Sequence, residues 1–298
     1  MVFGKKRRIV VASNKGFSDY LFEVINCAIL ILISIIMIYP FWHELCLSFS
    51  SSAEATRGGI FLLPRQFNIG AYKLVTRSPF LWTSFYNSIY CAVLTTLIGV
   101  MFTAMLAYPL SKKELMGNKF FAFIVVFCMI FNGGLVPTYL IVKNLGLINS
   151  LWGIILMAVV TPYNTIVMKN FFASLPTELE EAAFIDGAGP LRIFFTIILP
   201  LSKAVLATIS LWLAVASWNN FMGPLIYLND RELFTLPLYI RQVIEGQELA
   251  RTTGEGAQTA VQSVQGASII VTVIPILCVY PFLQKYFVKG VMIGAIKG

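Results

Sequence analysis

Long apolar stretches separated by short polar segments dominate the pattern of this chain. A membrane-spanning helix needs about 20 mostly apolar residues, and six stretches approach that length. We therefore predict an all-α fold, with one polytopic membrane domain at residues 21–298 and a cytoplasmic N-terminal segment at residues 1–20. The six transmembrane helices are predicted at residues 22–42, 85–110, 120–142, 151–172, 204–227 and 266–287.

Composition supports a membrane protein and argues against several other classes. Hydrophobic residues make up 58% of the chain and charged residues only 12%, whereas soluble domains contain about 25% charged residues. The net charge of +8 does not indicate nucleic acid, because the basic residues lie beside apolar segments. The five cysteines form no C-x-x-C pair, so we predict no metal site and no disulfide framework.

The distribution of lysine and arginine predicts the orientation in the membrane. Cytoplasmic loops of membrane proteins carry an excess of these residues. With the N-terminus in the cytoplasm, fourteen of the 22 lysines and arginines fall on the cytoplasmic side. Both termini are then cytoplasmic. Three connections are long enough to contain structure: external residues 48–83, cytoplasmic residues 173–202 and external residues 229–264.

The cytoplasmic connection contains a short acidic helix with clear start and stop signals. Thr177 and Glu180 have the spacing of a capping box, and acidic residues suit the positive N-terminal end of a helix. Gly187 is a natural end, because glycine tolerates the left-handed conformation. On this helix Ala182, Ala183 and Asp186 share a face, where the alanines permit another backbone to approach closely.

Two kinds of partner compete for this acidic helix. An amphipathic connector on the membrane surface usually presents lysine and arginine to anionic lipid. This segment is acidic, with Glu178, Glu180 and Glu181 in one turn, and anionic lipid would repel it. The sequence therefore favours a protein partner.

The residues of this connection resemble a known motif. Glu181-Ala182-Ala183, Asp186-Gly187 and Leu199-Pro200 resemble the EAA loop, here residues 174–202, of permeases from binding-protein-dependent ATP-binding-cassette (ABC) importers. Residues 63–88 and the C-terminal tail resemble the carbohydrate-uptake branch, the maltose-permease-like inner-membrane subunits. Residues 131–139 look like the subset that imports complex oligosaccharides. The resemblance implies the type I ABC importer permease fold and the plasma membrane of a bacterium.

The resemblance also implies how such a protein works. The loop would couple the permease to an ATPase, and the coupling residues would be Glu180, Glu181, Ala182, Ala183, Asp186 and Gly187. The implied partners are a second homologous permease subunit, two cytoplasmic ATP-binding subunits, and an extracellular substrate-binding lipoprotein or periplasmic binding protein. The chain has no G-x-x-x-x-G-K-[ST] motif for binding ATP. We therefore expect no cofactor and no catalytic residue here, with ATP and Mg on the partner ATPase.

Polar and aromatic residues inside the predicted helices are candidates for a substrate pathway. Polar groups within a membrane tend to face a cavity, and aromatic rings present flat apolar faces to sugars. The alternatives for each residue are helix–helix contacts or an interfacial aromatic belt. An uncharged lining would suit a neutral sugar. Asn132 lies beside Gly133 and Gly134, where we expect a break in the helix. The candidates are Trp218, Asn219, Asn220, Tyr163, Asn164 and Asn132.

Other classes of membrane protein remain as alternatives. An ABC permease for a non-sugar solute, such as glycerol phosphate, amino acids or metals, would share the same loop. An ion-coupled secondary transporter usually carries buried acids or histidines, but the acids here lie in loops. A membrane anchor would need neither an acidic docking helix nor polar clusters in several spans.

Overall fold

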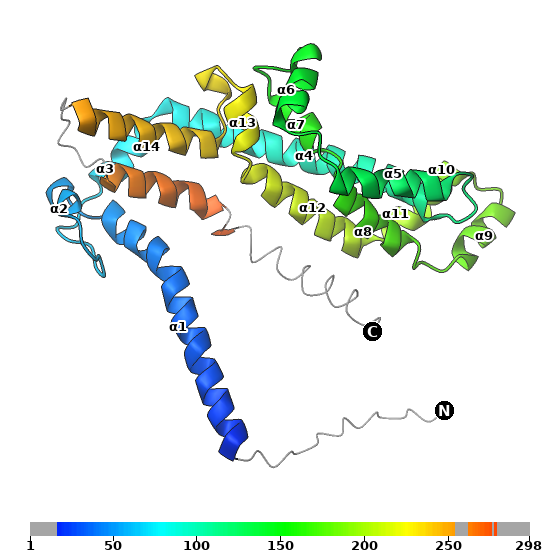
Figure 1. Ribbon diagram of the computed structural model, residues 1–298, viewed down its shortest axis with the longest axis horizontal. Helices are drawn as coiled ribbons and strands as arrows, with labels where there is room; N and C mark the ends of the chain where they lie inside the picture. Colours follow the sequence, from blue (N-terminus) through cyan, green and yellow to red (C-terminus); the bar gives the residue numbers. More distant parts are fainter. Residues whose placement is uncertain (1–16, 254–261, 276, 279–298) are drawn as a thin grey trace.

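The computed structural model describes residues 17–253, 262–275 and 277–278, and every regular element within them is helical. The predicted all-α class is therefore confirmed for these residues (Figure 1). A single turn of π-helix, η1 (Phe194–Ile198), and a 3₁₀ turn, η2 (Arg231–Leu233), interrupt the α-helices. The labelled α-helices are α1 (Phe17–Ser48), α2 (Ser52–Arg57), α3 (Gly70–Arg77), α4 (Pro79–Ser111), α5 (Asn118–Ile130), α6 (Leu135–Asn144), α7 (Leu151–Ala158), α8 (Pro162–Phe172), α9 (Glu178–Ile185), α10 (Pro190–Ile193), α11 (Leu199–Leu201), α12 (Lys203–Trp218), α13 (Met222–Tyr227) and α14 (Leu236–Thr253). Residues 262–275 and 277–278 are also helical.

Two helices of the described chain, α1 and α4, are each long and apolar enough to cross a membrane alone. Both match predicted spans, although each extends beyond the predicted bounds. Helix α1 begins at Phe17, so the predicted boundary between residues 20 and 21 falls inside it. The sixth predicted span, residues 266–287, is helical at residues 266–275 and 277–278, and the rest of it lies outside the described residues.

The other predicted spans are not continuous helices. The chain bends by 113° between α5 and α6, and by 44° between α7 and α8. The first break follows from Gly134, whose φ of +90° suits glycine alone, and it lies where the sequence pointed to a break. The second precedes Pro162, because a residue before proline disfavours the helical conformation. The fifth predicted span ends as a regular helix at Trp218 and resumes only at Met222.

Helix α4 is the centre of the bundle and packs along α12 and α8. Its buried side follows the helical repeat and consists mostly of small residues. In a membrane, helices associate through close van der Waals contact between such residues rather than through the hydrophobic effect. The buried small residues of α4 are Ser84, Ser88, Cys91, Thr95, Gly99, Thr103, Ala104 and Ala107.

Helix α1 diverges from this bundle (Figure 1). None of its most apolar stretch is buried, and only Cys46, Leu47 and Ser48 at its C-terminal end are buried. Different helices lie at the two ends of the bundle. Helices α2, α3 and α14 lie at one end, and α9 lies at the other.

Candidate functional site

Helix α9 corresponds to the predicted acidic helix and stands at one end of the bundle (Figure 1). The predicted capping box is wrong, because the Thr177 side chain accepts no hydrogen bond from the helix. Thr177 has φ −71° and ψ −26°, whereas a capping side chain requires an extended backbone. Its backbone carbonyl instead accepts the N–H groups of Glu180 and Glu181, at 3.0 and 3.1 Å.

The C-terminal end of α9 is formed by Gly187, as predicted. Gly187 has φ +79°, and its N–H donates to the Phe184 carbonyl at 3.0 Å. The Ala188 N–H donates to the Ala183 carbonyl at 2.9 Å. These two bonds make a Schellman motif, which turns the chain toward Pro190, the first residue of α10.

Replacing Gly187 with valine is expected to strain this turn. A β-branched residue at positive φ is disfavoured, by about 1–2 kcal/mol, and within the part of the chain that the structure describes, nothing lies within 4 Å of a Cβ at this position. The strain is therefore purely in the backbone. Thermal unfolding of the purified protein should show a lower midpoint for Gly187→Val than for Gly187→Asn, because asparagine tolerates the left-handed region better. Equal midpoints for the two variants would contradict the prediction.

The six predicted coupling residues do not share one face of α9. Glu180 is 7% exposed and Ala183 is buried, so both face the rest of this chain. Glu181, Ala182 and Asp186 are exposed, and Gly187 forms the turn. The sequence placed Ala182 and Ala183 together, but only Ala183 packs into the core.

The inward face of α9 is fixed by an ion pair with α4. Glu180 pairs through one carboxylate oxygen with the Lys112 ammonium group, and its other oxygen accepts the Tyr108 hydroxyl at 3.0 Å. The Lys112 nitrogen also lies 5.0 Å from the centre of the Tyr108 ring. We refer to Glu180, Lys112 and Tyr108 as the Glu180 cluster. Sequence reasoning missed Lys112 and Tyr108, because a lysine at the end of a span is equally expected as a topology signal.

The outward face of α9 and the following turn are apolar as well as acidic. Ile185 is 87% exposed, and Phe184 and Leu191 are also exposed. Beyond them the chain passes through η1 and Pro200 into α12, with a bend of 81° between Pro190–Leu201 and Lys203–Trp218. Proline lacks a backbone N–H, which accounts for the irregular turn there.

The candidate pathway residues occupy several different settings. Trp218 is half-buried against Phe85, with ring centres 6.1 Å apart. Tyr163 is exposed and lies 5.6 Å from the Trp212 ring, an aromatic neighbour that the sequence did not single out. Asn219 is exposed, whereas Asn164 is buried.

Two of the candidate asparagines have local structural roles. The Asn220 side-chain oxygen accepts the Gly223 N–H at 3.1 Å, at the start of α13. The Asn132 side-chain oxygen accepts the Gly134 N–H at 2.9 Å, in the break between α5 and α6. Both side chains stabilise breaks in helices. Asn132 is also exposed, and Asn220 is partly exposed.

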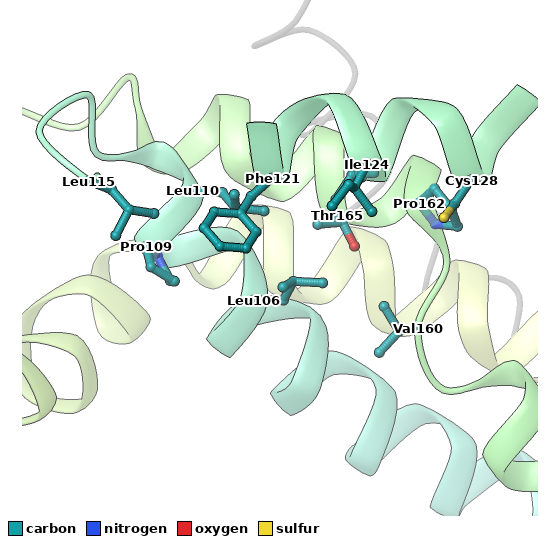
Figure 2. Close-up of a pocket in the computed structure, with 11 residues that line it drawn as sticks. Leu106, Pro109, Leu110, Leu115, Phe121, Ile124, Cys128, Val160, Pro162 and Thr165 are labelled. Atoms are coloured by element: carbon teal, nitrogen blue, oxygen red, sulfur yellow. The ribbon is translucent and has the colours of Figure 1, made fainter. Parts of the chain in front are cut away.

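A hollow between α4, α5 and α8 is a different kind of site (Figure 2). It encloses about 470 Å³ and is lined mainly by apolar side chains, including Leu106, Phe121 and Ile124. The Thr165 hydroxyl at its edge donates to the Thr161 carbonyl at 2.9 Å. Such a lining offers few partners for sugar hydroxyls, and none of the candidate pathway residues lines it.

A bundle of bent, apolar helices with an acidic helix exposed at one end is the architecture of an integral membrane protein with a polar element outside the membrane. The chain belongs to the family of binding-protein-dependent transport system inner membrane components, which it matches over residues 12–293. The predicted family is thereby confirmed. Membership places the protein in the bacterial plasma membrane and implies, in general terms, an ATPase and a binding protein as partners.

Individual relatives and a solved structure agree with this family. Protein LplC of Bacillus subtilis (strain 168) is 42% identical over 280 residues, which cover 93% of this chain and 95% of that protein. The polygalacturonan/rhamnogalacturonan transport system permease protein YtcP of the same organism is 38% identical, covering 93% and 99%. A chain of a bacterial ABC transporter involved in the import of the acidic polysaccharide alginate is 34% identical, with a TM-score of 0.84 and coverage of 91% and 98%. This similarity confirms the predicted importer permease fold.

Proposed function

We propose that this chain is the permease subunit of an ABC importer for oligosaccharides, and that the outward face of α9 docks on a cytoplasmic ATPase. The observation that supports docking is the exposure of Phe184, Ile185 and Leu191 beside acidic Glu181. Apolar side chains that gather on a surface outside the membrane mark an interaction site. Glu181 supplies a charge for a basic partner residue, and Ala182 and Asp186 lie on the same exposed side.

The substrate class is proposed from the relatives. The names of YtcP and of the alginate importer refer to polysaccharides, and a further relative at 30% identity is an arabinooligosaccharides transport system permease protein, AraQ, of Halalkalibacterium halodurans. A relative at 28% identity is an sn-glycerol-3-phosphate transport system permease protein, UgpE, of Brucella suis. A phosphorylated small solute is therefore the alternative.

The substrate pathway is proposed along α8 and α12. Tyr163 and Trp212 lie ring against ring where these helices meet, and exposed Asn219 follows the end of α12. Aromatic faces beside amide groups match the alternating C–H and hydroxyl surfaces of a sugar. Trp218, Asn220, Asn164 and Asn132 complete the proposed set.

The assembly is proposed to contain a second homologous permease, two ATP-binding subunits that hold ATP and Mg, and an extracellular lipoprotein or periplasmic binding protein. Both termini and α9 lie on the cytoplasmic side in this arrangement, and α2, α3 and α14 lie outside. The exposed apolar surface of α1 then meets lipid and the second permease. This chain itself performs no chemical step.

Purification and uptake test this proposal. The chain, expressed with its neighbouring transporter subunits, should co-isolate with a second permease and an ATPase pair. The reconstituted complex should import members of a panel of galacturonan fragments, arabino-oligosaccharides and raffinose only when ATP and the binding protein are present. Uptake of glycerol 3-phosphate but of no oligosaccharide would overturn the substrate class. Solute uptake at full rate without an ATPase would overturn the coupling.

A further inference from the structure

We propose that α4 connects the ATPase-docking helix to the external binding-protein side of this subunit, through the Glu180 cluster at one end and Asn87 and Ser88 at the other. The inference rests on the proposed function, because it assumes that α9 docks on the ATPase. It adds a route by which movement at α9 reaches the external segment. Neither Lys112 nor Asn87 belongs to the expected docking surfaces.

The cytoplasmic end of the route is a partly buried contact that consists of an ion pair and a hydrogen bond. Glu180 and Lys112 are 68 residues apart in sequence, so their ion pair joins two segments that no short stretch of backbone connects. Tyr108 donates to the same carboxylate, and its ring packs on Phe172 and Phe194, 6.2 and 5.2 Å away between ring centres. These two residues lie just before and just after the α9 segment. Helix α9 is therefore held to the end of α4 by its first turn, and the segments before and after α9 contact the Tyr108 ring.

The position of Lys112 is itself fixed. Asn118 donates from its side-chain nitrogen to the carbonyl oxygens of Lys112 and Leu110, at 2.6 and 2.9 Å. These bonds close the short loop between α4 and α5 against the end of α4. A buried carboxylate whose partner is removed is left with an uncompensated charge. Loss of either partner should therefore destabilise this contact.

The opposite end of α4 holds the segment at residues 231–236 in a similar way. The Asn87 side-chain nitrogen donates to the carbonyl oxygens of Glu232 and Phe234, at 2.8 and 3.1 Å. The Leu236 N–H donates to the Ser88 hydroxyl oxygen at 2.8 Å. The Arg231 guanidinium group also lies 4.1 Å from the centre of the Phe80 ring. Residues of α4 thus position the turn that leads into α14.

Helix α4 is continuous between these contacts, with Pro109 in its last turn. Asn87 and Lys112 are separated by 25 residues, or about 38 Å at the helical rise of 1.5 Å per residue. Small side chains along this length pack closely on α12 and α8. A displacement of α9 by the ATPase is therefore passed to α4 directly, and not only through the chain that leads to α12.

The experiment measures solute imported per ATP hydrolysed, in the complete complex reconstituted in vesicles with the panel sugar that gives the fastest uptake. Lys112→Glu places two carboxylates together, and Asn87→Leu removes the two external hydrogen bonds. Each variant is expected to lower the ratio about tenfold, because the loss of coupling between two sites typically changes the measured quantity by about 5- to 150-fold. Their combination should lower the ratio no further, because both act on one route.

Matched variants separate this route from a general loss of structure. The exchange of charges, Lys112→Glu with Glu180→Lys, should restore the ratio to within about threefold of the unmodified protein, since it again places opposite charges at the two positions. Glu114→Gln in the same loop and Thr83→Ala on the exposed side of α4 should leave the ratio unchanged. Three results would overturn the inference. The first is a ratio in Lys112→Glu equal to that of the unmodified protein, and the second is no recovery of the ratio in the charge exchange. The third is a loss in the combined variant equal to the product of the two separate losses. If the unmodified complex neither imports nor hydrolyses, the proposed function fails instead.

Discussion

Replacement of Glu181 with lysine is expected to abolish uptake while the protein remains inserted in the membrane. Glu181 is exposed on α9, so the change leaves the packing of this chain intact. A charged contact that becomes desolvated on docking contributes about 2–5 kcal/mol, so its reversal should weaken ATPase binding at least about 30-fold. Co-purification of the ATPase with the tagged permease measures this loss, and immunoblotting of membranes measures insertion.

Glu114→Lys is the matched control for Glu181→Lys. It introduces the same change of charge at an exposed position of the same end of the bundle, but outside α9. It should retain the ATPase and transport solute. Normal uptake by Glu181→Lys, or equal losses in the two variants, would contradict docking through α9.

Replacement of Gly99 with leucine is expected to prevent stable folding of the bundle. A Cβ at Gly99 would lie 2.8 Å from the Val159 carbonyl oxygen and 2.8 Å from the Leu213 Cδ1 atom. The first of these neighbours is backbone and cannot rotate away. Extra methylenes in a tightly packed site typically cost about 1–3 kcal/mol, and leucine adds four carbons. The thermal midpoint of the detergent-solubilised protein, together with its yield, measures the loss.

Gly246→Leu provides the same exchange in open surroundings. No atom of the described residues lies within 4 Å of a Cβ at Gly246, which is exposed on α14. Leucine has a higher helix propensity than glycine, so stability should be unchanged or slightly raised. A thermal midpoint for Gly99→Leu equal to that of Gly246→Leu would show that α4, the end of α7 and α12 do not pack as closely as described.

The sequence predicts α1 and α4 well because both are uninterrupted apolar stretches of sufficient length. The breaks are less predictable. Pro162 marks one of them, but apolar residues on both sides conceal it in a count of hydrophobic residues, and the irregular turn after Trp218 follows from local hydrogen bonds to Asn220. The acidic helix and its end at Gly187 are predictable from residue types alone. Its capping box is not, because the backbone of Thr177 takes the helical conformation.

The division of α9 into two faces lay beyond sequence reasoning. Glu180 and Glu181 are neighbours of the same type, and Ala182 and Ala183 are identical. What distinguishes them is the presence of Lys112, Tyr108 and the core on one side of the helix only, which depends on tertiary packing. The motif residues therefore identify the segment, whereas their individual surroundings come from the structure.

The non-helical turn at residues 131–134 constrains the surroundings of the subunit in the bilayer. Peptide groups outside a helix are tolerated at membrane depth only where protein or water solvates them, and these residues are exposed within this chain. Acyl chains are therefore unsuitable neighbours for the junction of α5 and α6 if this junction lies within the hydrocarbon region. In that position, this side of the subunit would face the hydrated or protein-covered interior of the assembly, and other surfaces would form the lipid annulus.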